Sequence, residues 1–258
     1  MGPSIDGRIV TTRWGSRNIL SAEYERTAET FDADAWIIGR ISMEPYAGKA
    51  KVPRRKAKLR IPREDFTAES DAESYAIAID PSGKLTWKSS AIEGEHVITV
   101  ISERVSDDYL AFLQSKGVSY LFGGRADIDL SKVLVKLRKH FGIRKLLLEG
   151  GGRINGSFLA ADLIDELSVL IAPVADGSVG TPTLFDVEAR RGPARNLRLI
   201  SVQKLKATSC GSDIKSERFG VRCIGTALSA VARRGRRQRA AGWKAAASRR
   251  TPKVPLIC

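Results

Sequence analysis

Residues 144–173 read RKLLLEGGGRINGSFLAADLIDELSVLIAP. The leucines at 146–148 do not alternate with polar residues, which is typical of a strand covered on both faces of a parallel sheet. The glycines at 150–152 have no Cβ, so the backbone there can adopt a positive φ and let a ligand come close. A helical pattern follows from about residue 154, and 167–172 is a second apolar strand. This stretch predicts a strand–loop–helix–strand unit whose helix N-terminus can bind a phosphate.

The glycine loop alone leaves two interpretations open. Its pattern is GGGxxxG, which differs from the GxGxxG pattern of dinucleotide-binding Rossmann folds. Three glycines can also make a tight turn between a strand and a helix without binding any ligand. The remainder of the chain favours the phosphate-binding interpretation.

Strand and helix patterns alternate up to about residue 224, which predicts an α/β fold with a single, mostly parallel, twisted sheet flanked by helices. Three expected strands run directly into glycine, at Gly39, at Gly123-Gly124 and at Gly150. Because ligands bind beyond the carboxyl ends of parallel strands, we expect these points to meet at one crevice. The expected strands are 35–38, 75–80, 96–101, 118–122, 146–148 and 167–172, and the expected helices are 22–31, 107–115 and 130–141.

Composition indicates an ordinary globular protein. Of the 258 residues, 43% are hydrophobic and 28% are charged. No apolar run is long enough to span a membrane and no signal peptide is evident, so we expect a cytoplasmic protein with no membrane partner. The three cysteines lack CxxC spacing and the two histidines stand alone, so we expect neither a disulfide framework nor a metal site.

The positive charge is concentrated at one end of the chain. The formal net charge is +14, and residues 226–258 contain seven Arg and two Lys with no Asp or Glu. We therefore divide the chain into an α/β domain at 1–225 and a basic tail at 226–258, which is predicted to be disordered. Such a tail can bind nucleic acid through phosphates, but a solvated extension is the favoured interpretation, and we expect no other nucleic-acid contact.

Four short motifs together resemble one family. They are the segments 4–9 (SIDGRI), 38–42 (IGRIS), 148–152 (LEGGG) and 165–173 (DELSVLIAP). In their order and spacing they resemble the dihydrofolate reductase-like superfamily, and within it the reductase domain of the bacterial riboflavin-biosynthesis deaminase-reductase. The likeness covers about residues 2–205 and implies a dihydrofolate reductase-like fold.

The resemblance implies an NADPH-dependent reductase similar to 5-amino-6-(5-phosphoribosylamino)uracil reductase. Such an enzyme transfers hydride from the nicotinamide to a pyrimidine-linked ribose or a similar small molecule, and the family implies a homodimer. The glycine loop and helix start would receive the cofactor diphosphate, and the GRxS element would lie near the adenosine 2′-phosphate. The implied cofactor residues are Gly2, Gly39, Arg40, Ser42, Gly150, Gly151, Gly152, Arg153 and Ile154.

The resemblance also implies roles for three polar residues. Glu149 would contact substrate and is a catalytic candidate, because the riboflavin-type enzymes have a glutamate where dihydrofolate reductases are apolar. Asp6 is the second catalytic candidate, expected to brace the loop beside the nicotinamide more than to transfer a proton. Ser16 matches a substrate-contacting serine. On residue type alone, Glu149 could instead cap the following turn, and Arg40 could be a surface cation.

Some positions depart from the family pattern. Asn18 replaces a tryptophan, Thr30 replaces a substrate-phosphate arginine, and 42–46 reads SMEPY where the family has a TVxxDDP run. These departures keep two alternatives open: a dihydrofolate or pterin-type reductase, and a non-catalytic nucleotide-binding homologue. The resemblance also implies a strand before Ser4, for which we expect little or no length, and a final strand for which 218–224 is the candidate.

Overall fold

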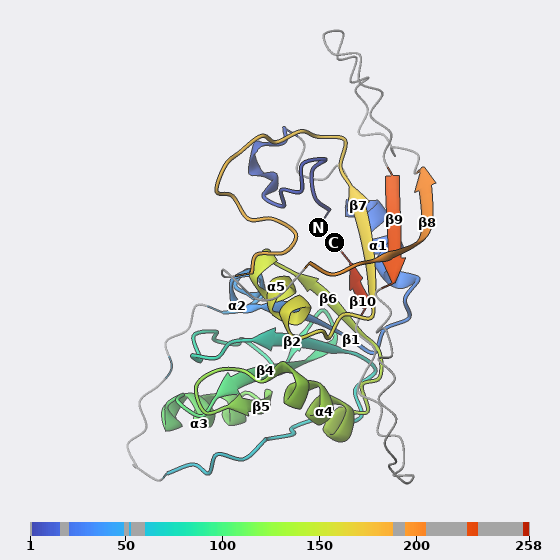
Figure 1. Cartoon of the computed structure of the whole chain (residues 1–258). Coiled ribbons are helices and arrows are strands. Elements are labelled where there is room, and N and C mark those ends of the chain that lie inside the picture. The colour runs from blue at the N-terminus through green and yellow to red at the C-terminus, as the bar shows by residue number, and fades with distance from the viewer. Residues whose placement is uncertain are drawn as a thin grey trace, which may run out of the picture.

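A computed structural model of the chain describes residues 2–15, 21–48, 52, 60–187, 194–204, 226–231 and 255–257. These residues form one mixed, mostly parallel sheet with helices packed against it (Figure 1). The expected α/β architecture is therefore confirmed.

One half of the sheet is built outward from its first strand. The strand order is β5-β4-β2-β1, every pair is parallel, and β3 is a short antiparallel partner of β4. The chain then crosses back, and β6 pairs in parallel with the free side of β1. The direction in which strands are added thus reverses between β1 and β6. The bounds are β1 (Ala35–Gly39), β2 (Tyr75–Ile79), β3 (Ala91–Ile92), β4 (Glu95–Ser102), β5 (Ser119–Gly124) and β6 (Leu146–Gly150).

The other half of the sheet contains strands from the C-terminal region. Beyond β6 the order is β10, β7, β9, β8; β10 is parallel to both neighbours, whereas β9 is antiparallel to β7 and β8. Residues 226–258 were expected to form a disordered tail, but in this structure they contribute β9 and β10, because their backbones pair with β7. The candidate strand at 218–224 lies outside the described residues. The bounds are β7 (Glu166–Ile171), β8 (Arg198–Lys204), β9 (Thr226–Val231) and β10 (Pro255–Ile257).

The helices begin and end where local sequence favours it. Ser106 caps the first turn of α3 (Asp107–Ser115), and Asp129 caps α4 (Leu130–Phe141) by accepting a hydrogen bond from the Lys132 N–H at 3.1 Å. Gly142 ends α4 with a left-handed φ of 69°. The other helices are η1 (Thr11–Arg13), α1 (Ser21–Glu29), α2 (Arg40–Met43) and α5 (Gly152–Ala160).

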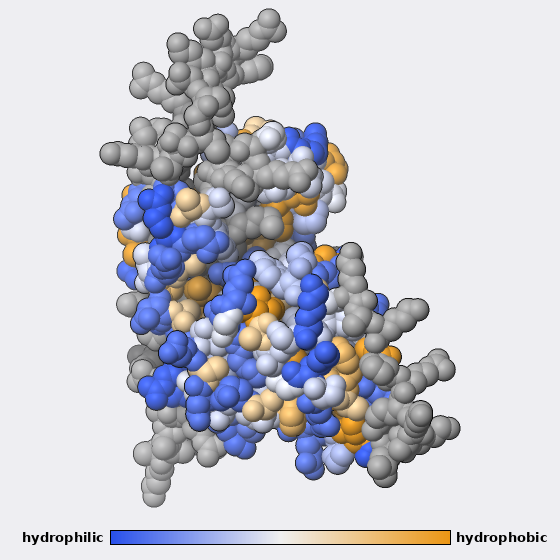
Figure 2. All heavy atoms as spheres, turned by 180° about the vertical axis from the view of Figure 1, so that it is seen from behind, coloured by the Kyte–Doolittle hydropathy of each residue, from blue (hydrophilic) through white to orange (hydrophobic). Residues whose placement is uncertain are grey.

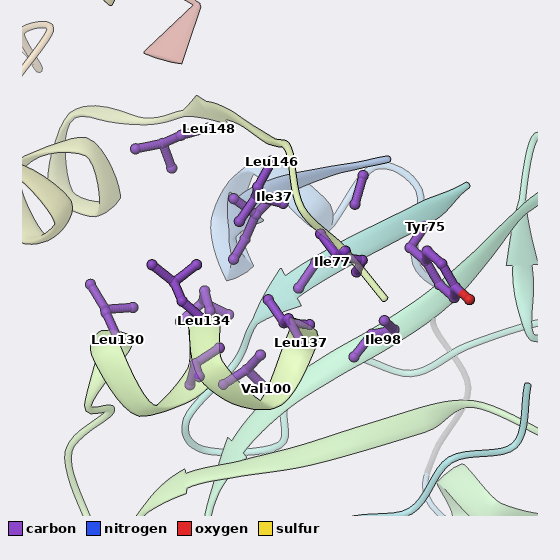
Figure 3. Packing of buried hydrophobic residues seen from close by; sticks show 14 of the residues in the cluster. Ile37, Tyr75, Ile77, Ile98, Val100, Leu130, Leu134, Leu137, Leu146 and Leu148 are labelled. Carbon is purple, nitrogen blue, oxygen red and sulfur yellow. The ribbon is translucent and has the colours of Figure 1, made fainter. Parts of the chain in front are cut away.

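Two hydrophobic cores cover the two faces of the sheet. Successive strand residues point to opposite faces, so Ile37 belongs to one core and Ile38 to the other. Leu134 and Leu137 of α4 pack with Ile37 in the first core (Figure 3), and the second core is closed by α3. Burial of each such side chain contributes about 1.5–3 kcal/mol to folding. The two cores therefore hold β1 firmly in place in the sheet.

The surface seen in Figure 2 is mostly hydrophilic, with separate hydrophobic patches. Among the described residues, no helix has the length and apolar character needed to cross a membrane.

Candidate active site

The site is built where strand order reverses, between the carboxyl ends of β1 and β6. Ligands of open α/β sheets bind in the crevice outside such a switch point. A Cβ built on Gly151 would lie 3.3 Å from Ser42 Oγ, and one built on Gly39 would lie 3.7 Å from Ile154 Cβ. Two of the three predicted glycine points therefore adjoin each other.

The third glycine point does not join this crevice. Gly124 ends β5, which is separated from β1 by β4 and β2. A Cβ on Gly124 would lie 2.4 Å from the carbonyl oxygen of Asp127, so glycine is required there by a local turn. The expectation that all three points converge was wrong, because strands 119–124 and 35–39 are not neighbours.

The three glycines of the loop have different local roles. Gly150 (φ 109°) and Gly151 (φ 83°) have backbone conformations that side chains rarely adopt, and no atom lies within 4 Å of a Cβ built on Gly150. By contrast, a Cβ on Gly152 would lie 2.3 Å from the Thr183 carbonyl oxygen. Gly150 thus leaves open space beside the backbone and Gly151 lies against Ser42, whereas Gly152 permits close packing of the 183–186 loop.

Glu149 is the extra residue of a β-bulge. Ile37 of β1 pairs with Leu148, but the next residue, Ile38, pairs with Gly150. Glu149 consequently has no partner residue in β1 and lies directly before the glycine loop. Bulges of this kind are common beside active sites because they redirect a side chain.

Burial shifts the Glu149 carboxyl toward its neutral, protonated form. Burial raises its pKa from 4.5 to about 7, the charge of Glu25 adds to the rise, and a hydrogen bond from Tyr24 of α1 opposes it. A carboxyl of this pKa can take up or release a proton near pH 7, which a simple turn cap does not require.

Arg40 is the first residue of α2 and follows Gly39 directly. It forms an ion pair with Glu44, and its positive charge acts on the carboxyl of Asp80, which lies buried at the end of β2. The Arg40 side chain is about 29% exposed, so part of it faces solvent. A guanidinium has planar donors that suit a phosphate.

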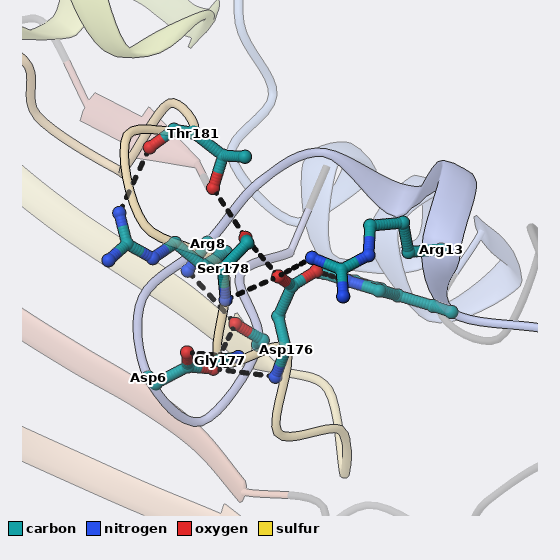
Figure 4. A network of polar contacts seen from close by, with 9 residues as sticks. Asp6, Arg8, Arg13, Asp176, Gly177, Ser178 and Thr181 are labelled. Carbon is teal, nitrogen blue, oxygen red and sulfur yellow. Dashed lines mark hydrogen bonds and ion pairs between the residues drawn. The ribbon is translucent and has the colours of Figure 1, made fainter.

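Asp6 accepts hydrogen bonds from the loop that follows β7 and from Ser4. The N–H groups of Asp176 and Gly177 donate to it at 3.0 and 2.9 Å, and the Ser4 hydroxyl donates at 2.7 Å (Figure 4). These bonds hold the pKa of Asp6 well below its usual range. An acceptor held ionised in this way supports the predicted bracing role better than proton transfer.

A polar network extends this brace, and sequence reasoning did not identify it. Trp14 Nε1 donates to Asp176 Oδ2 at 2.7 Å, and Arg13 forms an ion pair with Asp176 Oδ1 at 3.3 Å. Arg8 donates to the Thr181 carbonyl at 3.0 Å (Figure 4). The Asp-Gly pair at 176–177 marked a turn, but no local pattern indicated what the turn would bind.

The braced turn is linked to the start of α5. The N–H of Leu184 donates to the Gly7 carbonyl at 3.3 Å, and the N–H of Asp186 donates to the Gly152 carbonyl at 2.9 Å. The 183–186 loop therefore connects the turn that carries Asp6 to the glycine loop beside Glu149.

Of the remaining predicted residues, Arg153 is exposed on the first turn of α5 and Gly2 is buried beside the N-terminal turn. Ser16 lies outside the described residues. The roles assigned to individual residues stay predictions.

Residues 1–215 match the family described as the RibD C-terminal domain. The chain belongs to that family. A riboflavin biosynthesis protein RibD of Aquifex aeolicus is 25% identical over 219 residues, covering 82% of this chain and 54% of that protein. A 2,5-diamino-6-ribosylamino-4(3H)-pyrimidinone 5′-phosphate reductase of Methanothermobacter thermautotrophicus is 35% identical over 99 residues, covering 38% of this chain and 45% of that protein.

Two solved structures share the fold. RibD of Acinetobacter baumannii superposes with a TM-score of 0.59 at 18% identity over 90% of this chain and 56% of its own. A pyrimidine reductase-like protein of Corynebacterium diphtheriae gives the same TM-score at 15% identity, covering 90% of both chains. The chain thus spans about half the length of the two RibD proteins.

Proposed function

We propose that this RibD C-terminal domain chain is an NADPH-dependent reductase that acts on a ribosylaminopyrimidine phosphate. The observation that carries the proposal is the position of Glu149: a carboxyl on a bulge, at the switch point of the sheet, directly beside a glycine loop with an open backbone. Relatives named for reduction of a diaminoribosylaminopyrimidinone phosphate support the substrate class.

The residues around the crevice fit a dinucleotide phosphate. Gly150 leaves open space where another residue would have a Cβ, and Gly151 brings the backbone against Ser42. The start of α5 can offer N–H groups to the diphosphate. We assign the adenosine 2′-phosphate to Arg40, since a fork of donors binds phosphate bidentately, and this assignment gives the preference for NADPH over NADH.

Bound NADPH supplies a hydride and its electron pair. Hydride addition to a C=O or C=N carbon leaves the oxygen or nitrogen in need of a proton. Glu149 can hold that proton at neutral pH, because burial raises its pKa to about 7. Tyr24 holds the carboxyl in place through its hydrogen bond, and Asp6 fixes the loop at 176–177 that borders the site.

We also propose a homodimer in the cytoplasm. β8 is an edge strand whose Leu199, Ile200 and Val202 side chains are all exposed. An apolar edge of this kind tends to pair with another chain. Light scattering of the purified protein tests this point, and a monomer at micromolar concentration would contradict it.

The decisive experiment is titration with NADPH and NADH, followed by energy transfer from tryptophan to the nicotinamide. Micromolar binding that favours NADPH and weakens in Arg40→Ala supports the cofactor assignment. Turnover is then measured with a ribosylaminopyrimidine phosphate and with dihydrofolate. Turnover of dihydrofolate alone would contradict the substrate class, and failure to bind either nucleotide would favour the non-catalytic alternative.

A further inference from the structure

A strand of only three residues lies in the interior of the sheet. Pro255, Leu256 and Ile257 form β10, which is placed between β6 and β7 and is parallel to both. On one side Leu256 pairs with Leu148, and on the other side the three residues pair with 166–168. A three-residue segment from the C-terminal end thus joins the two halves of the sheet.

The N-terminal segment continues the line of this strand. Beyond β10, the N–H of Ala172 donates to the carbonyl of Pro3 at 2.8 Å. Ile257 lies opposite Ser168, four residues before Ala172. Pro3 and Ile257 thus both lie beside β7. β10 and Pro3 therefore occupy successive stretches along β7.

Two parts of the candidate site, Glu149 and the turn that carries Asp6, adjoin the place of β10 in the sheet. Leu148, the partner of Leu256, immediately precedes Glu149. Pro3 leads into the turn that carries Asp6, and that turn contacts the loop after β7. Without β10, β6 and β7 would each lose a neighbouring strand. Glu149 and the turn that carries Asp6 would then both lie beside a gap in the sheet.

In the sequence, β10 lies far from the other strands of the sheet. The family match ends at residue 215, and residues 232–254 separate β9 from β10. A strand tethered in this way is held by its own pairing and by the high effective concentration that the tether provides. Extended segments that add to a sheet are recognised through main-chain hydrogen bonds.

We propose that the gap between β6 and β7 is a strand-binding site, that its occupant is this chain's own C-terminal segment, and that binding of Pro255–Ile257 holds Glu149 at its working position. The strand-binding site stands independently of the proposed reductase activity. Only the effect on turnover rests on the proposed function.

The test compares the full chain with a chain truncated after residue 251. Amide hydrogen exchange is measured at Leu148 and Glu149 in β6 and at Ser168 and Val169 in β7. We expect exchange at these amides to accelerate at least tenfold on truncation, while Ile77 and Ile98 in β2 and β4 keep their protection. If reductase activity is established, turnover should fall in parallel.

A synthetic peptide of residues 251–258 is then added under reducing conditions. It should restore protection in β6 and β7 in a saturable manner. The matched control is the same peptide carrying Leu256→Pro, which lacks an N–H at the central position of the strand, and it should restore nothing; a Leu256→Val peptide keeps the N–H and should act like the native one.

Two results would overturn the proposal. Unchanged exchange in β6 and β7 after truncation would show that no strand is bound there. Loss of protection throughout the sheet that the native peptide does not reverse would show that the segment is not a separable occupant. The expected exchange changes in a full chain that shows no reductase activity would count against the reductase assignment alone.

Discussion

Ser42 and Gly151 face each other across the crevice so closely that a methyl group on Gly151 would lie 3.3 Å from the Ser42 hydroxyl oxygen. Gly151 also has a φ of 83°. A Gly151→Ala substitution should therefore strain the loop and move Ser42, and we expect NADPH affinity to fall at least about tenfold, which is about 1.4 kcal/mol. Fluorescence titration measures the change.

Gly142→Ala is the matched control for this prediction. Gly142 has a φ of 69° and ends α4, and no atom lies within 4 Å of its added Cβ. The substitution should cost roughly 1–2 kcal/mol of stability through backbone strain and leave NADPH affinity unchanged. Equal losses of NADPH affinity in Gly151→Ala and Gly142→Ala would show that the contact between Gly151 and Ser42 is not the cause.

Glu149→Gln keeps the shape of the side chain and removes its titratable proton. We expect turnover to fall by about 100-fold or more, the usual effect of losing a general acid or base, with NADPH affinity near that of the wild type. In the wild type, turnover should fall as pH rises through about 7, where the Glu149 carboxyl loses its proton. Steady-state kinetics across pH 5–9 would show this, and a variant with wild-type turnover would remove Glu149 from the reaction.

The contribution of the Glu149 carboxyl to stability should change with pH in the opposite direction to that of a carboxylate in an ion pair. Burial raises the Glu149 pKa from 4.5 to about 7, so the folded state binds more protons than the unfolded state between these values. The contribution of Glu149 is therefore most favourable below pH 4.5 and is lost as pH rises to about 7. At pH 8, Glu149→Gln should be more stable than the wild type by at most about 3 kcal/mol.

Urea unfolding at pH 4.5 and pH 8 measures this difference. The advantage of the variant should be present at pH 8 and small at pH 4.5. An advantage of equal size at both pH values would indicate a packing effect and contradict the linkage to ionisation.

Arg40→Ala should lower affinity for NADPH and leave affinity for NADH unchanged, because only NADPH carries the 2′-phosphate. Hydrogen bonds to charged groups contribute about 1.5–3 kcal/mol each, so the loss should be roughly 10- to 100-fold. Arg144→Ala serves as the control, since Arg144 is exposed before the start of β6, at the opposite end of that strand. Equal weakening of both nucleotides would assign Arg40 a structural role.

Local sequence predicted the central elements well. The 130–141 helix was predicted from its amphipathic apolar spacing alone, and the structure gives the same bounds. The apolar runs at 35–38 and 146–148 were identified as strands because burial on both faces leaves no polar alternation. Glu149 and the glycine loop could be placed together for the same reason: they are adjacent in the chain.

Long-range pairing could not be predicted in this way. Strand order is not a local property, so the separation of Gly124 from the crevice was missed. Pro255–Ile257 has only three residues and follows a basic segment, so it carries no recognisable strand pattern; its place depends on partners about 90 to 110 residues away in the sequence. Likewise, Asp176 gains its partners from residues 6, 13 and 14.

The bulge in β6 is formed by Glu149, the residue that we propose as the acid of the reaction. If Glu149 were deleted, Gly150 would directly follow Leu148, and β1 and β6 could pair without interruption. A relative that lacks the codon for Glu149 would keep the sheet, with more regular pairing between β1 and β6, and would lose the carboxyl. If Glu149 has the proposed role, the number of residues between the leucine run and the first glycine distinguishes members of this family that have the acid from those that lack it.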